Sequence, residues 1–216
     1  MAAGDLTDTL VDVLQIRMEN PEGDKFTDAM CLDALNYAQK KAALFLHDKY
    51  LSELEVLTSA GAATASVKAF PSGAGNAPLN GAEGILEVYS VTNTGYLKRN
   101  RVEEMKRLEN TYLAGSTTNL TYYLFDEKIY ISTDTAADSL QEYILITPVE
   151  MTTTVDPVLN ASLYDIILKF AEAILWTASD KLKRRVSAYQ DALNQIKRLN
   201  DLAYKTRAEG IGTAKQ

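Results

Sequence analysis

Residues 20–28, Asn-Pro-Glu-Gly-Asp-Lys-Phe-Thr-Asp, decide the fold near the start of this 216-residue chain. Proline disfavours a helical conformation in the residue before it, and glycine readily adopts a positive φ, so this stretch ends one helix. Thr27 is a favoured N-cap residue and begins another helix, with Phe26 placed to pack on Cys31 as a hydrophobic staple. The stretch therefore predicts a helical hairpin with a short turn.

Apolar residues recur at helical spacing on both sides of this turn. Before it, residues 5–19 predict one amphipathic helix, which Asp5 is expected to cap. After it, residues 28–50 predict a longer helix whose alanines allow close approach by another helix. The N-terminal quarter of the chain is thus expected to be helical.

Two further helices are expected near the C-terminus. Asn160 or Ser162 can cap the first, which is strongly apolar, and the second begins near Asp180. The apolar positions of the second are spaced four, three, four and three residues apart, which is typical of a coiled-coil seam. That seam consists of Leu182, Val186, Tyr189, Leu193 and Ile196.

The middle of the chain has the patterning of strands. Residues 85–91 and 142–148 alternate in a way that favours β-structure. Residues 122–131 predict a β-hairpin that turns at Asp126-Glu127-Lys128. A short helix is expected at 101–113 and a surface loop at 71–78.

These patterns predict an α+β fold, a helical bundle formed by the N- and C-terminal helices with a central β-rich insertion. The expected parts are a helical hairpin at 1–52, the β-rich insertion with its short helix at 53–155, the C-terminal helices that complete the bundle at 156–204, and an extended C-terminal tail at 205–216. The tail has little apolar surface to offset the entropy of ordering it, so we expect it to be disordered in an isolated subunit.

The composition excludes most catalytic and metal chemistry. A single cysteine, Cys31, cannot form an intrachain disulfide or a cysteine-based zinc cluster, and we expect it to be a buried, inert thiol. The single histidine, His47, excludes a set of imidazoles for metal binding or acid–base catalysis, and it is expected at a helix end. We therefore expect no catalytic residues, no cofactor and no metal. Neither a secretory signal nor a 20-residue apolar span is readable.

The charge of the chain is uneven along its length. The net charge is −7, but residues 1–60 carry five basic and eleven acidic side chains, whereas residues 181–207 carry eight basic and two acidic ones. An acidic chain is a poor candidate for wrapping DNA. The opposite charges could meet between neighbouring subunits, or the basic stretch could be a solvated helix face.

Motifs at both ends of the chain carry a family resemblance. Residues 20–28 followed by Leu35-Asn36-Tyr37-Ala38-Gln39 are similar to an Asp/Asn-Pro-x-Gly … Ser/Thr-Asp turn before a helix with Leu-Asn-x-Ala. Residues 143–148, 156–173 and 189–199 are similar to a closing strand and two helices. Together they resemble the head-to-tail adaptor (connector) proteins of tailed bacteriophages, over about residues 5–50 and 120–205.

The resemblance implies a structural, non-catalytic protein of the virion, made in the cytoplasm of the bacterial host. Such adaptors form a ring, usually of twelve subunits, under the portal protein at the head-tail junction. The ring extends the DNA channel and docks the tail, so its implied partners are the portal and tail or nozzle proteins. Genomic DNA would pass with non-specific contact only, and no membrane is involved.

Two sets of contact residues follow from this interpretation. The C-terminal tail would dock on the portal through Lys205, Arg207, Ile211 and Lys215. The predicted hairpin would face the tail with backbone edges or side chains, namely Tyr123, Asp126, Glu127, Lys128 and Tyr130. Two alternatives remain open: a tail-completion protein or other virion interaction module, and a small cell-wall hydrolase, which would need a cleft with perturbed carboxylates.

Overall fold

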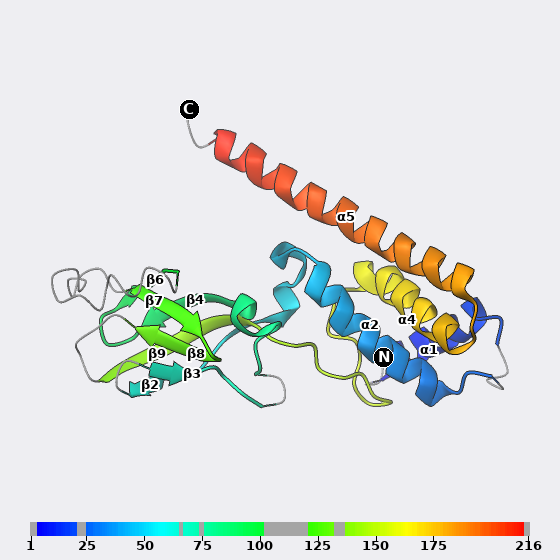
Figure 1. Cartoon of the computed structure of the whole chain (residues 1–216), viewed down its shortest axis with the longest axis horizontal. Coiled ribbons are helices and arrows are strands. Elements are labelled where there is room, and N and C mark those ends of the chain that lie inside the picture. The colour runs from blue at the N-terminus through cyan, green and yellow to red at the C-terminus, as the bar shows by residue number, and fades with distance from the viewer. Residues whose placement is uncertain are drawn as a thin grey trace. The chain divides into compact units, whose positions relative to one another are not determined.

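The computed structural model describes residues 4–20, 25–64, 67–73, 76–101, 121–131 and 137–213. The chain divides into two compact units, one made of Met1–Glu53 with Pro148–Gln216 and the other of Leu54–Thr147. The described helices longer than one turn all belong to the first unit, and the described strands belong to the second (Figure 1). We call them the helical unit and the sheet unit.

The helical unit is built around its most apolar helix. Its helices are α1 (Asp5–Arg17), α2 (Asp28–Phe45), α4 (Tyr164–Ala178) and α5 (Leu182–Thr213), with the single-turn helices η1 (Asp48–Tyr50) and η4 (Ala161–Leu163) beside them. Helix α4 contacts each of the other three, which explains why eight of its fifteen residues are buried. Both ends of the chain thus share one core.

The start of α1 differs from the prediction. Asp5 is the first helical residue, and the N-cap position is Gly4, whose φ is 96°. A Cβ atom at residue 4 would lie 2.0 Å from the carbonyl oxygen of Thr153, so the position has no room for a capping side chain. Asp156 caps the helix instead, because its Oδ1 accepts hydrogen bonds from the amides of Leu6 at 3.1 Å and Thr7 at 3.4 Å.

Two other predicted caps are confirmed. The Thr27 hydroxyl accepts a hydrogen bond from the Met30 amide at 3.4 Å and begins α2. Asn160 caps η4 by accepting from the Ser162 amide at 3.0 Å, so Asn160 rather than Ser162 starts the C-terminal helices. Residues 21–24 of the predicted turn lie outside the described residues.

Helix α5 packs on a stripe that shares Ile196 with the predicted seam but leaves out the first residues of that seam. Its buried residues are Ala188, Ala192, Ile196 and Ala203, whereas Leu182 and Val186 are 63% and 57% exposed. Alanines allow a neighbouring helix to approach closely, and this explains why the packed stripe follows them rather than the larger side chains. The first turns of α5 therefore leave apolar side chains on the surface.

The C-terminus also corrects the prediction. Residues 205–213, expected in an extended tail, continue α5 as helix. Lys205, Arg207 and Glu209 are good helix formers, and Gly210 costs only about 1 kcal/mol in a helix interior. Thus no strong stop signal separates these residues from the helix before them.

The sheet unit consists of one nine-stranded sheet. Its strands are β1 (Glu55–Leu57), β2 (Gly61–Thr64), β3 (Val67–Ala69), β4 (Ile85–Ser90), β5 (Gly95–Tyr96), β6 (Lys98–Arg99), β7 (Thr121–Phe125), β8 (Lys128–Ile131) and β9 (Ala137–Leu145), with the single-turn helix η3 (Gly81–Gly84) before β4. The order is β5-β4-β9-β2-β3-β8-β7-β6, and β1 pairs with β9. Only the β6–β7 pair is parallel among those described.

The predicted hairpin is confirmed as β7–β8. Its two turn residues, Asp126 and Glu127, have φ angles of 48° and 54°, as a type I′ turn requires. Tyr123 and Tyr130 face each other across the two strands, and their rings stack with centroids 4.6 Å apart. The helix predicted at 101–113 lies outside the described residues, apart from Arg101.

The predicted fold class, a helical bundle with a β-rich insertion, is wrong. The strands form a large mixed sheet that is nearly closed on itself and has its own apolar core, which includes Val88, Leu140 and Ile144. Among the strands that the sequence did not predict, β5 and β6 have two residues each, too few for periodicity to reveal, and Gly61–Thr64 has the composition of a connector. Pairing with β9, about 75 residues later, makes that segment a strand.

Candidate functional site

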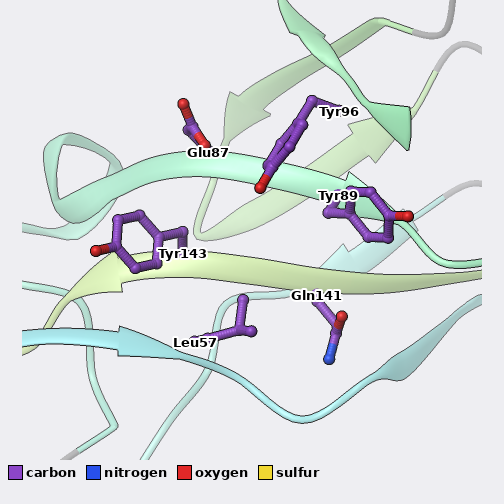
Figure 2. A pocket seen from close by; sticks show the side chains of 6 residues that line it. All are labelled: Leu57, Glu87, Tyr89, Tyr96, Gln141 and Tyr143. Atoms are coloured by element: carbon purple, nitrogen blue, oxygen red, sulfur yellow. The ribbon is translucent and has the colours of Figure 1, made fainter. Parts of the chain in front are cut away.

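A hollow of about 320 Å³ lies on one face of the sheet. We call it the tyrosine pocket, and Leu57, Glu87, Tyr89, Tyr96, Gln141 and Tyr143 line it (Figure 2). These side chains come from four strands, β1, β4, β5 and β9. Three tyrosines, one carboxylate and one amide thus share a small volume.

Strand register explains why these residues meet. Alternate residues of a strand face the same side, so β4 presents Glu87 with Tyr89 and β9 presents Gln141 with Tyr143. Glu87 lies opposite Tyr143, and Tyr89 lies opposite Gln141. The neighbouring strands add Leu57 opposite Tyr143 and Tyr96 opposite Tyr89. Val88, between the two β4 residues, and Leu140 and Ile144, on either side of the two β9 residues, belong to the core on the other face.

The rings of the tyrosine pocket are held by contacts within it. Tyr89 and Tyr96 meet edge to face, with centroids 5.2 Å apart and planes at 70°. The Tyr143 hydroxyl donates to the Glu55 carboxylate, and this hydrogen bond, more than burial, raises the pKa of Tyr143. The negative charges of Glu55 and Glu87 raise it further. The Tyr143 hydroxyl therefore stays protonated, with two carboxylates near it.

The opposite face of β9 holds a buried ion pair. Glu142 is fully buried, and the Lys68 Nζ lies 2.6 Å from its Oε1 and 2.9 Å from its Oε2. The Thr58 hydroxyl donates to Oε2 at 2.5 Å, and Lys68 also donates to the Leu140 carbonyl oxygen at 2.9 Å. Lys68 reaches Glu142 across Gly61, where an added Cβ would lie 3.0 Å from the lysine Nζ and Cε.

This ion pair is a structural group. Both Glu142 oxygens face Lys68, and the side chain has no exposed surface, so no substrate can reach the carboxylate. Only the position of Glu142 in the strand pattern could have indicated this ion pair from the sequence. Glu142 shares a strand face with the apolar residues Leu140 and Ile144, where a charge is unexpected.

The helical unit offers a different kind of surface. Large apolar side chains are exposed on three of its helices, and they include Ile16, Tyr37, Leu44, Leu182 and Val186, each more than half exposed. A hollow of about 500 Å³ between α1 and α2 is lined by three carboxylates, Asp8, Asp12 and Asp28. Helix α5 carries exposed cations, such as Lys183, Lys197 and Arg198. Opposite charges therefore stand on different helices of one unit.

The residues predicted to bind the portal belong to α5. Lys205 is exposed on that helix. Arg207 and Ile211 lie in its last turns, and Lys215 falls outside the described residues. The structure thus places three of the four on one helix instead of on an extended tail.

The residues predicted to face the tail belong to the β7–β8 hairpin. Lys128 lies 3.7 Å from the Asp126 carboxylate in an exposed ion pair, and Phe125 beside the turn is 58% exposed. The expected free backbone edge is mostly absent from the described strands, because β8 pairs with β3 and β7, and β7 also pairs with β6 at Thr121 and Tyr122. The hairpin can offer its turn and its side chains to a partner.

Cys31 and His47 behave as expected from the sequence. Cys31 is fully buried, and burial raises the pKa of its thiol to about 11, with a further contribution from Asp28. His47 precedes η1, where its Nδ1 accepts a hydrogen bond from the Lys49 amide at 3.2 Å. Within the described ranges, no group of three or more His, Cys, Asp or Glu is placed to hold a metal ion.

No protein-family model matches the sequence, and no curated protein is significantly similar to it. None of the helices in the described part of the chain is long and apolar enough to cross a membrane. Function must therefore be inferred from the surfaces of this chain. The tyrosine pocket escaped sequence reasoning, although the alternation Glu87-Val88-Tyr89 and Gln141-Glu142-Tyr143 is a signal that could have indicated it.

Proposed function

We propose that this protein is a phage head-to-tail adaptor, a structural subunit that forms a ring under the portal, extends the DNA channel and docks the tail. The observation that carries the proposal is the surface of the helical unit, where α1, α2 and α5 expose apolar side chains, α1 and α2 carry carboxylates, and α5 carries cations. The resemblance of residues 5–50 and 120–205 to adaptors supports the same interpretation.

The preference for a ring over a two-fold dimer rests on the family resemblance, because opposite charges on different helices fit either arrangement away from the axis. Only at the axis of a two-fold dimer would acidic α1 face acidic α1 or basic α5 face basic α5. A heterologous contact instead places the basic surface of one subunit on the acidic surface of the next. Repeated around an axis, such a contact closes into a ring, and the resemblance implies about twelve subunits.

The two partners of the ring are assigned to different elements. The end of α5, with Lys205, Arg207 and Ile211, would dock on the portal together with Lys215, which lies beyond the helix in the sequence. The β7–β8 hairpin would contact the tail. About twelve equal contacts on one symmetric partner hold the ring by avidity even where each contact is weak.

Assembly of the purified chain, alone and with a portal protein, tests this proposal. Negative-stain electron microscopy should show closed rings, and sedimentation should show one large species that weakens as salt rises. Val186→Asp puts a charge on the exposed face of α5 and should abolish assembly. Val91→Asp, at a valine that is exposed on the sheet unit, is the matched control and should assemble normally.

Two outcomes would contradict the proposal. One is a chain that stays monomeric at all concentrations and does not bind a portal, as expected of another virion interaction module. The other is a two-fold dimer with nothing larger. Equal assembly of Val186→Asp and Val91→Asp would show that the ring, if present, does not use the exposed face of α5.

A further inference from the structure

We propose that the tyrosine pocket binds a basic side chain, arginine or lysine, presented by a partner protein. The site lies on the sheet unit and is independent of the proposed ring contacts of the helical unit. Three features of its lining carry the inference: its charge, its aromatic faces and its hydrogen-bond acceptors.

The charge of the pocket selects a cation. Glu87 lines it, and Glu55 lies at its border, hydrogen-bonded to the Tyr143 hydroxyl. None of the six lining residues is a lysine, arginine or histidine, and no cation within the described ranges forms an ion pair with Glu87. Phosphate, nucleic acid and carboxylate ligands would meet uncompensated negative charge there. A positively charged ligand would relieve it.

The aromatic faces favour a cation with an apolar stem. Tyrosine rings attract cations placed over their faces, and the edge-to-face arrangement of Tyr89 and Tyr96 leaves ring surface open to the pocket (Figure 2). Tyr96 is 71% exposed and Leu57 is 59% exposed, so the entrance is accessible and can cover the methylene groups of an inserted side chain. A volume of about 320 Å³ is enough for one such side chain.

The hydrogen-bond acceptors distinguish a basic side chain from a quaternary ammonium ion. The Glu87 carboxylate accepts hydrogen bonds, and Gln141 uses its Nε2 to donate to the Thr58 carbonyl oxygen at 3.5 Å, which leaves its own carbonyl oxygen as an acceptor. A quaternary ammonium ion has no N–H group for these acceptors. Guanidinium and ammonium groups have several, and the planar guanidinium also stacks on tyrosine rings.

Small-molecule titration tests the proposal on the full chain. Chemical shifts of the tyrosine ring signals are followed as N-acetylarginine amide, N-acetyllysine amide, the neutral isostere N-acetylcitrulline amide or choline is added. The two basic amides should shift the pocket signals and should bind at least about fivefold more tightly than the citrulline amide, because only they carry the charge. Choline should bind more weakly than arginine because it cannot donate hydrogen bonds.

Variants locate the binding in the tyrosine pocket. Tyr96→Leu keeps an apolar side chain but removes the ring, and it should weaken arginine binding by about fivefold, whereas Tyr96→Phe should retain most of it. Glu87→Gln should weaken it several-fold. The matched controls are Glu83→Gln, an exposed glutamate elsewhere in the sheet unit, and Tyr37→Leu, an exposed tyrosine of the helical unit; neither should change binding.

Three results would overturn the proposal. Equal binding of the citrulline and arginine amides would show an apolar site without charge selection. Binding of choline at least as tight as that of arginine would assign the pocket to quaternary ammonium ligands. Unchanged binding in both Tyr96→Leu and Glu87→Gln would place the ligand elsewhere. Should Tyr96→Leu not fold, Glu87→Gln and the ligand series decide the question.

Discussion

The two units of this chain differ in the largest polar side chains that are fully buried in their cores. In the helical unit the fully buried Gln39 donates to the Val149 carbonyl oxygen at 3.0 Å and accepts from the Val158 amide at 3.2 Å. Asn36 makes a similar pair of bonds with the backbone of Met151. Neutral amides thus tie α2 to a segment more than 100 residues away. The sheet unit instead relies on one charged pair, Lys68–Glu142, in its core.

This difference predicts where each unit is vulnerable. In the helical unit several neutral hydrogen bonds contribute to stability, so the loss of one leaves the others in place. A buried ion pair is weak evidence for net stability, but removal of one partner leaves an uncompensated charge in the core. We therefore expect the sheet unit to be more sensitive to a single substitution than the helical unit.

The largest predicted effect comes from Lys68→Met. The substitution leaves Glu142 buried without its cation and should lower the free energy of unfolding of the sheet unit by about 3–5 kcal/mol. Hydrogen exchange of peptides from β9 measures the sheet unit. Fluorescence of Trp176, the single tryptophan, measures the helical unit, where it is buried.

The double variant Lys68→Met/Glu142→Leu is the control for Lys68→Met. It replaces both charges by apolar side chains of similar size and should recover most of the lost stability. A single variant that loses less than about 1 kcal/mol, or a double variant as unstable as the single one, would show that the ion pair does not dominate the sheet core.

The next largest predicted effect is on the stability of the helical unit. Asp156→Ala removes the only side-chain cap described for α1 and should cost about 1 kcal/mol of stability, measured by denaturant unfolding followed at Trp176. Asp12→Ala, at an exposed position within α1, should change stability by less than about 0.5 kcal/mol. Equal effects of the two substitutions would mean that Asp156 does not act as a cap.

The sequence predicted the helical unit better than the sheet unit, for physical reasons. Helix caps are local, so Thr27 and Asn160 could be assigned from their neighbours alone. The cap of α1 could not, because it depends on a contact between Gly4 and Thr153 that excludes a side chain at residue 4. The packed stripe of α5 was predicted only in part, because close packing on alanines depends on the partner helix.

The sheet depends on contacts that sequence spacing does not contain. Strand β2 is Gly-Ala-Ala-Thr, and only its pairing with β9 makes it a strand. The same long-range register places Tyr96 beside Tyr89 and Leu57 beside Tyr143, and so creates the tyrosine pocket. The hairpin turn at Asp126 and Glu127 was predictable because both of its strands are adjacent in the sequence.

The smallest predicted effect tests whether charge matters in the helical unit. Asp165 lies 2.8 Å from Arg17 and accepts from Gln195 at 2.7 Å, while Arg17 also pairs with Glu172 at 3.0 Å. Burial raises the pKa of Asp165, but the hydrogen bonds from Gln195 and Arg17 outweigh burial and lower it overall. The carboxylate form is therefore favoured in the folded state.

A lowered pKa in the folded state gives a defined dependence on pH. The stability that Asp165 contributes is present above its unfolded pKa of about 3.9 and is lost as the pH falls through the lower folded pKa. Because the side chain is 46% exposed, solvent screening limits the contribution to a few tenths of a kcal/mol. Asp165→Asn should thus be slightly less stable than the wild-type chain at pH 7 and should match it near pH 2, in thermal unfolding at both values.

Asp191→Asn, in a longer ion pair with Lys169 at 3.5 Å, is the control and should show a smaller difference. An Asp165→Asn deficit that is equally large at both pH values would mean that shape and hydrogen bonding, rather than charge, hold this contact. The charge of Asp165 would then contribute nothing to the helical unit, and the contrast with the charged pair in the sheet core would be larger.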